Sequence, residues 1–176
     1  MKRILSAVCC MALCWVPALA QKAHSAKSAA AAMTDQQFVD FAAQTDMMEA
    51  HLGQMAANQA SRQDVKDYAQ MLVSDHTSDY QQLSDVAAKA SLTVPKGLDD
   101  EHNKLIAPLE KLKGAAFDSG YIRAMVAGHT KAISVYTKES TEAQNGDLKS
   151  YASATLPTLQ KHLDGAKNLE KKPSKK

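Results

Sequence analysis

Four stretches of this chain repeat their apolar residues at alternating intervals of three and four, which is the period of one face of an α-helix. The stretches open at Thr34, Ser61, Gly114 and Asp147. Thr34 and Gln37 form the capping-box pattern that starts a helix. The predicted stripes are Phe38, Phe41, Thr45, Met48, Leu52 and Met55 in the first helix; Val65, Ala69, Leu72, His76, Tyr80, Leu83, Ala87 and Ala90 in the second; Asp118, Ile122, Met125, His129, Ala132, Tyr136 and Ala143 in the third; and Leu148, Tyr151, Thr155, Leu159, His162, Ala166 and Leu169 in the fourth. No run alternates apolar and polar residues as a strand would, so the sequence predicts an all-α fold.

The links between these helices differ in length, and this predicts how the helices connect. Two links are short, whereas residues 91–113 form a long one that carries a short amphipathic piece, Leu105, Leu109 and Leu112, interrupted by Pro108. A long connection in the middle of four helices is what a ferritin-like bundle requires. We therefore predict a ferritin-like four-helix bundle over residues 34–170, with a long crossover between helices 2 and 3. A kink or a lost backbone hydrogen bond is expected at Pro157.

The first twenty residues have the features of a secretory signal peptide rather than of a folded domain. Lys2 and Arg3 precede an apolar run that is too short to span a bilayer, and "ALA" at 18–20 offers a cleavage site after Ala20. A retained N-terminal anchor is the alternative. Cleavage would remove all three cysteines, leaving an exported chain without disulfides. The expected location is the periplasm or cell envelope, and residues 21–33 are expected to be a flexible linker.

Charge excludes some partners. Two of the 21 lysines and arginines lie in the predicted signal, so the mature chain has 19 basic and 19 acidic residues. Such a balance does not predict a nucleic-acid-binding face, and the lysines of the tail, residues 171–176, are typical of a frayed end. We expect no integral membrane segment after cleavage. No catalytic triad, phosphate loop or HExxH motif is present, so the sequence favours a non-catalytic role.

Three histidines interrupt the apolar stripes, one in each of the last three helices. These are His76, His129 and His162, and Glu49 flanks the stripe of the first helix, about 60° from its centre. Each of the four residues lies fifteen positions beyond the predicted start of its helix. Because they stand near the middle of their helices, they are expected at one level of the bundle, whichever way each helix runs.

Three imidazoles and one carboxylate at one level are suitable ligands for a divalent transition metal such as zinc, iron or copper. The sequence therefore predicts a metal site at Glu49, His76, His129 and His162. Each histidine would also need an acceptor for its second ring nitrogen. The candidates for that role are Asp75, Asp79, Tyr80, Asp118, Tyr121 and Tyr136.

Other interpretations of these residues remain open. A buried histidine layer can serve only to specify the packing of a bundle. An oxidase or peroxide-consuming enzyme would need an open coordination position, for which the sequence offers no separate motif. Met47, His51 and Met55 share a helix face that suits cuprous ion, although methionine more often fills a core. No protein partner is indicated.

The segments "TDQQFVDFAAQTDMMEAHLGQMA", "VKDYAQMLVSDHTSDYQQL", "GAAFDSGYIRAMVAGHTKAI" and "LKSYASATLPTLQKHLDGAKNL" resemble the bacterial family called domain of unknown function 4142. The resemblance covers roughly residues 34–170. It implies an exported protein with the ferritin-like fold, but no particular biochemistry. Val73, Val126 and Leu159 stand where di-iron ferritins would have the glutamate of Glu-x-x-His, so we expect no carboxylate-bridged di-iron centre. The expected function is metal handling or a stress role in the envelope.

Overall fold

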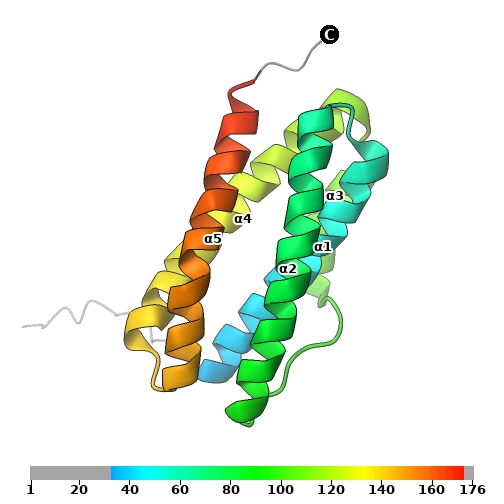
Figure 1. The fold of residues 1–176 in the computed structure, drawn as a ribbon. Helices are drawn as coiled ribbons and strands as arrows, with labels where there is room; N and C mark the ends of the chain where they lie inside the picture. Colours follow the sequence, from blue (N-terminus) through cyan, green and yellow to red (C-terminus); the bar gives the residue numbers. More distant parts are fainter. Residues whose placement is uncertain (1–32, 173–176) are drawn as a thin grey trace, which may run out of the picture. The chain divides into compact units, whose positions relative to one another are not determined.

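The computed structural model describes residues 33–172, which form five helices and no strand (Figure 1). The helices are α1 (Asp35–Gln59), α2 (Gln63–Lys89), α3 (Asp100–Glu110), α4 (Gly114–Glu142) and α5 (Gly146–Glu170). The predicted all-helical bundle is confirmed. The predicted count of four is wrong, because the crossover folds as a helix of its own, α3. The ferritin-like assignment stays a prediction.

The predicted signal peptide, residues 21–32 of the linker and residues 173–176 of the tail lie outside the described part of the chain. Within the described part, no helix combines the length and the apolar character needed to cross a membrane.

The four long helices form two hairpins that pack against each other (Figure 1). α1 packs along α2, and α4 packs along α5. Between the hairpins, α1 contacts α4 and α2 contacts α5, while the short α3 lies against α1 and α4. Ile106 and Leu109 are buried and form the inner face of α3. Leu105, which was predicted to lie on that face, is 56% exposed.

Local capping explains where the helices begin. In the predicted capping box of α1, the Thr34 hydroxyl accepts from the amide of Gln37 at 3.2 Å, and the Gln37 side chain accepts from the amide of Thr34 at 2.9 Å. Asn145 caps α5 through the amides of Asp147 and Leu148. α5 continues through Pro157 to Glu170, so the proline costs a backbone hydrogen bond without ending the helix.

The start of α2 is held by a residue from a different helix. Ser61 was expected to open this helix, but α2 begins at Gln63 and has no side-chain cap of its own. Asp118 of α4 accepts instead from the Ser61 amide at 3.0 Å, from the Ser61 hydroxyl at 2.5 Å and from the Arg62 amide at 3.2 Å. Asp118 was among the residues predicted to accept from a histidine ring. In the structure its carboxylate instead joins α4 to the start of α2.

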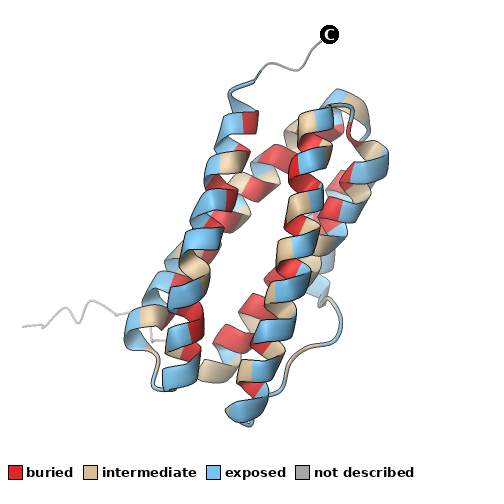
Figure 2. Ribbon diagram, viewed as in Figure 1, coloured by how far each residue is buried: buried red, intermediate tan, exposed pale blue. Residues whose placement is uncertain are grey.

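The buried residues lie on the facing sides of the long helices (Figure 2). They form two apolar clusters with a polar layer between them. One cluster is built around Leu72, Phe117 and Met125, and the other around Phe38 and Tyr136. Along each long helix, the buried residues pass from one cluster to the other through a short polar segment. The clusters thus surround the polar layer with apolar side chains at both ends.

The buried face of α1 is rotated relative to the predicted stripe. Phe41, Met48 and Met55 are only partly buried, whereas Glu49 and Gly53 are buried. α1 approaches α2 closely at Gly53, where a Cβ would lie 2.6 Å from Val73 Cγ2. Since a glycine makes this contact, a stripe drawn through large apolar residues missed the centre of the face. Glu49, predicted to flank the stripe, belongs to the buried face.

Candidate metal centre

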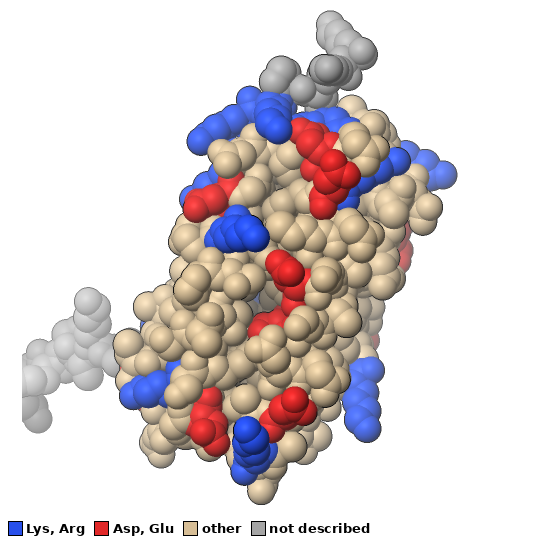
Figure 3. Space-filling view, in the orientation of Figure 1, with Lys and Arg blue, Asp and Glu red and all other residues tan. Residues whose placement is uncertain are grey.

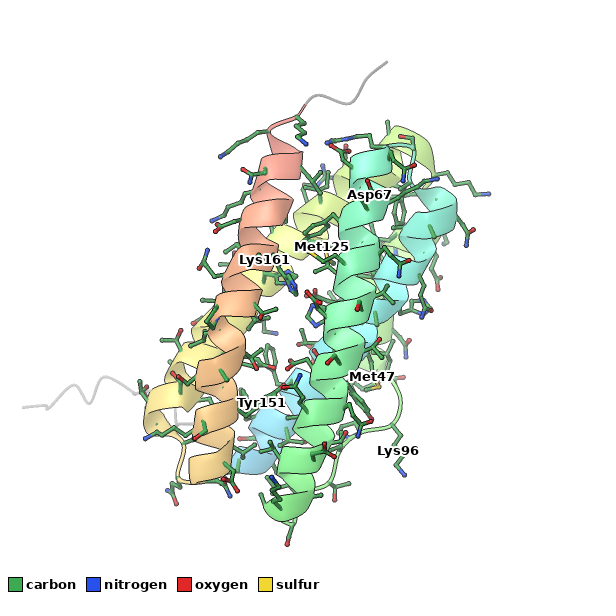
Figure 4. All side chains as sticks on the ribbon, viewed as in Figure 1. Met47, Asp67, Lys96, Met125, Tyr151 and Lys161 are labelled. Carbon is green, nitrogen blue, oxygen red and sulfur yellow. The ribbon has the colours of Figure 1, made fainter. Side chains whose placement is uncertain are left out.

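The structure brings all four predicted site residues together in the polar layer. Glu49 comes from α1, His76 from α2, His129 from α4 and His162 from α5, and none of them is more than 2% exposed. The centroids of the three imidazole rings are 5.2–5.7 Å apart. Met125 and Tyr151, labelled in Figure 4, belong to the apolar clusters on either side of this layer.

One ring nitrogen of each histidine is held by an acceptor. His76 Nδ1 lies 2.8 Å from Asp46 Oδ1, His129 Nδ1 lies 2.9 Å from the Met125 carbonyl oxygen, and His162 Nε2 lies 2.9 Å from Asp75 Oδ2. An imidazole that donates through one nitrogen presents a lone pair on the other. When a ring is neutral, such a contact orients it so that its second nitrogen can accept a proton donor or bind an ion.

The second nitrogens are buried and have no hydrogen-bond partner among the described residues. They are Nε2 of His76, Nε2 of His129 and Nδ1 of His162. One nitrogen from each of these rings lies within 4.8 Å of the other two. Buried polar atoms in native proteins are nearly always satisfied, so these three nitrogens are able to accept one further partner each.

Glu49 adds a carboxylate to the same point. Its Oε2 lies 2.9 Å from His76 Nε2 and 3.2 Å from His129 Nε2, yet neither contact has hydrogen-bond geometry. Burial opposes ionisation of Glu49, but the positive field of His76 and His129 outweighs it and lowers the pKa of the carboxyl group. A fully buried carboxylate without hydrogen bonds requires a positive charge beside it.

His76 has acidic groups on both sides. Burial works against a charged imidazole, but Glu49 and Asp46 outweigh it and raise the pKa of His76 well above its ordinary value. His162 differs, because burial is the main influence and lowers its pKa to about 4. The pKa of Asp46 is raised to about 7, again chiefly by burial.

Only one of the six predicted acceptors, Asp75, holds a histidine. Asp118 instead caps α2, and Asp79 accepts a hydrogen bond from the Tyr151 hydroxyl at 2.8 Å. The Tyr80 hydroxyl donates to the Pro95 carbonyl at 2.6 Å, and the Tyr136 hydroxyl lies 3.4 Å from that of Tyr151. The Tyr121 hydroxyl has no partner among the described residues.

Two acceptors were missed. The sequence gives no signal for the Met125 carbonyl beyond its place one turn before His129. Asp46 was detectable, since it stands three residues before Glu49 and therefore on the same face of α1.

The face of Met47, His51 and Met55, which would suit cuprous ion, is not gathered around one point. Met47 packs against the cluster of Phe38, and Met55 packs against the cluster of Leu72, on opposite sides of the polar layer. His51, between them, is exposed.

A cleft of about 770 Å³ between α2 and α5 leads to the polar layer. His76 and His162 line this cleft, and so do Asp75, Asp79 and Tyr151. In Figure 3, acidic side chains gather in the hollow at the middle of this face. The centre is thus buried but borders on a depression that opens to solvent.

Several solved structures share this fold at low sequence identity. CopM in the Cu(II)-bound form is 17% identical, with a TM-score of 0.64 over 78% of this chain and 95% of that one. CopM in the Cu(I)-bound form is 15% identical, with a TM-score of 0.63 over 77% of this chain and 94% of that one. A DUF305 fragment from Deinococcus radiodurans is 14% identical, with a TM-score of 0.67 over 80% of this chain and 98% of that one.

No curated protein matches the sequence. The model of the family described as domain of unknown function, DUF4142, matches residues 20–169, which confirms the resemblance seen in the sequence. This chain belongs to the DUF4142 family.

Proposed function

We propose that this chain binds a divalent transition metal ion through Glu49, His76, His129 and His162, and handles that metal in the cell envelope without catalysing a reaction. The observation that carries the proposal is the set of three buried, unpartnered ring nitrogens beside the Glu49 carboxylate. Each of these rings is fixed from its far side by an acceptor. That combination is what histidine ligands of metal ions have in other proteins.

The distances suit an ion of this class. Metal–nitrogen and metal–oxygen bonds of about 2.0–2.2 Å place neighbouring ligands of a tetrahedral ion about 3.3 Å apart. The contacts of Glu49 Oε2 with His76 and His129, at 2.9 and 3.2 Å, are already close to that separation. One nitrogen of each imidazole lies within 4.8 Å of the other two, a separation within which three histidines could share one ion.

The chemistry of the ligands narrows the choice of metal. Three imidazoles and one carboxylate, without sulfur, suit zinc, copper(II) or iron better than magnesium or calcium. Copper is the first metal to test, because the similar CopM structures hold Cu(II), Cu(I) or Ag.

One observation favours the alternative function, a bundle whose polar layer only specifies packing. An imidazolium at His76 would sit between Asp46 and Glu49 and neutralise the buried carboxylate without any metal. Buried ionic groups of this kind fix the register of some helical bundles. The two functions differ in whether the three unpartnered nitrogens take up an ion.

The test is to purify the mature chain from the periplasm without an affinity tag and measure its metal content, followed by titration of the metal-free chain with zinc, copper(II) and ferrous ions. We expect one ion per chain, lost in His129→Ala and retained in His51→Ala, which removes an exposed histidine from α1. An ion that binds only the folded chain, at a free concentration of 100 times its Kd, raises the free energy of unfolding by about 2.7 kcal/mol. A chain that purifies empty and gains no thermal stability from any of these ions would support the packing function instead.

A further inference from the structure

The cleft between α2 and α5 borders on the candidate centre. Of the four proposed ligands, His76 and His162 line this cleft, and Glu49 and His129 do not. The two cleft-lining histidines are at most 2% exposed, and each has an unpartnered ring nitrogen. An ion arriving through the cleft would thus reach the rings of His76 and His162 before Glu49 and His129, which do not line it.

The lining of the cleft favours a cation. It includes four aspartates, Asp75, Asp79, Asp85 and Asp147, against two lysines, Lys89 and Lys161, for a formal net charge of −2. The hydroxyl groups of Ser78, Ser150, Thr155 and Thr158 add neutral oxygens along the walls. A cleft with a net charge of one sign concentrates ions of the opposite sign and raises their rate of association.

Asp75 joins this lining to the centre. Its carboxylate is partly exposed, with 37% of the side chain accessible, and it contacts Nε2 of the buried His162 at 2.9 Å across the two helices. The same group therefore faces the cleft and holds a candidate ligand. Asp75 is a positioning residue, because it acts on the ion through the orientation of His162.

We propose that the α2–α5 cleft is the route by which a hydrated divalent cation reaches the Glu49 and histidine centre; this rests on the proposed function. The acidic walls attract the cation, and the opening between the helices admits it. The hydroxyl and carboxylate oxygens of the walls replace part of its water shell before it meets His162 and His76.

The test measures how fast Co²⁺, followed by its visible absorption, enters the metal-free full-length mature chain. The double variant Asp85→Asn/Asp147→Asn removes two charges from the cleft, one on α2 and one on α5. Asp67→Asn/Asp164→Asn removes two exposed charges from the same helices outside this cleft, and is the matched control. We expect the first pair to slow association roughly three- to tenfold at low ionic strength, and the control to change it less than twofold. Added salt should reduce the difference.

A second variant tests the route by blocking it. Ala154 is exposed and lines the cleft, so Ala154→Trp fills space there without touching the core. We expect slower association and slower release of Co²⁺ with a Kd unchanged within about twofold, because a plug raises the barrier in both directions. Normal binding with equal rates in both double variants and in Ala154→Trp would overturn the route alone. A chain that binds no metal under any condition would overturn the proposed function, and the route with it.

Discussion

Gly128 of α4 lies directly against the carboxylate of Glu49 on α1: a Cβ at position 128 would be 3.2 Å from Oε1. Such a contact is closer than side chains ordinarily tolerate, so the absence of a side chain at position 128 makes room for the buried acid. Position 128 also immediately precedes His129. One turn of α4 thus supplies a candidate ligand and the space for another.

Replacing Gly128 should separate metal binding from stability. In Gly128→Ala the new methyl group pushes Oε1 away by a few tenths of an ångström, and we expect about tenfold weaker metal binding. Alanine is the better helix former by about 0.5–1 kcal/mol, so thermal stability of the metal-free chain should stay level or rise. Calorimetric titration and thermal melts check the two effects. Gly146→Ala, where a Cβ meets nothing within 4 Å, is the control; equal affinities in the two variants would contradict the role given to Gly128.

Asp46 should affect metal binding through the orientation of His76. Asp46→Ala removes the acceptor that lies 2.8 Å from His76 Nδ1, and we expect a 10- to 100-fold loss of metal affinity. Asp46→Asn keeps an oxygen that can accept from the ring, so most of the affinity should return. An alanine variant that binds as tightly as the parent would show that His76 needs no such support.

Asp118 should affect stability without affecting the metal. Its carboxylate accepts from three donors at the start of α2, two amides and one hydroxyl. Asp118→Ala leaves these donors without their partner, and we expect a loss of about 2–4 kcal/mol in the free energy of urea unfolding. Metal stoichiometry at low temperature should match that of the parent. A fall in metal stoichiometry in a folded variant would show instead that Asp118 supports a histidine ligand, as the sequence suggested.

Glu139 should make the protein less stable as the pH rises. It is 5% exposed, and burial, with a smaller contribution from the negative charge of Asp35, raises its pKa to about 7. Between about pH 4.5 and pH 7 the folded chain holds a proton that the unfolded chain releases, so this residue costs stability progressively over that range. Glu139→Gln should therefore be more stable than the parent at pH 8, by about 1–3 kcal/mol, and nearly equal to it at pH 4.5. Urea unfolding at both pH values measures this, with the exposed Glu142→Gln expected to show no such difference.

The height of the four candidate ligands could be predicted from the sequence because an α-helix rises by a fixed amount per residue. Counting from the predicted starts placed Glu49 and His129 near the middle of their helices, which is one level whichever way a helix runs. α1 and α4 begin within one residue of the predicted Thr34 and Gly114. α2 begins at Gln63, two residues after the predicted Ser61, and His76 still lies near the middle of that helix.

Rotation of the helices about their axes could not be predicted in the same way. It depends on which residues let two helices approach, and in α1 this is Gly53, which contributes nothing to an apolar stripe. Asp46 was missed because the stripe drawn for α1 left the Glu49 face at its flank, although Asp46 and Glu49 share that face. Asp79, which lies one turn beyond Asp75, bonds a tyrosine rather than a histidine.

Each hairpin supplies two of the four candidate ligands: Glu49 and His76 come from α1 and α2, and His129 and His162 come from α4 and α5. Neither half of the polypeptide can assemble the full set alone, so the centre comes into being only after the later hairpin has docked on the earlier one. An ion held there would mark the completed tertiary structure and tie its two halves together.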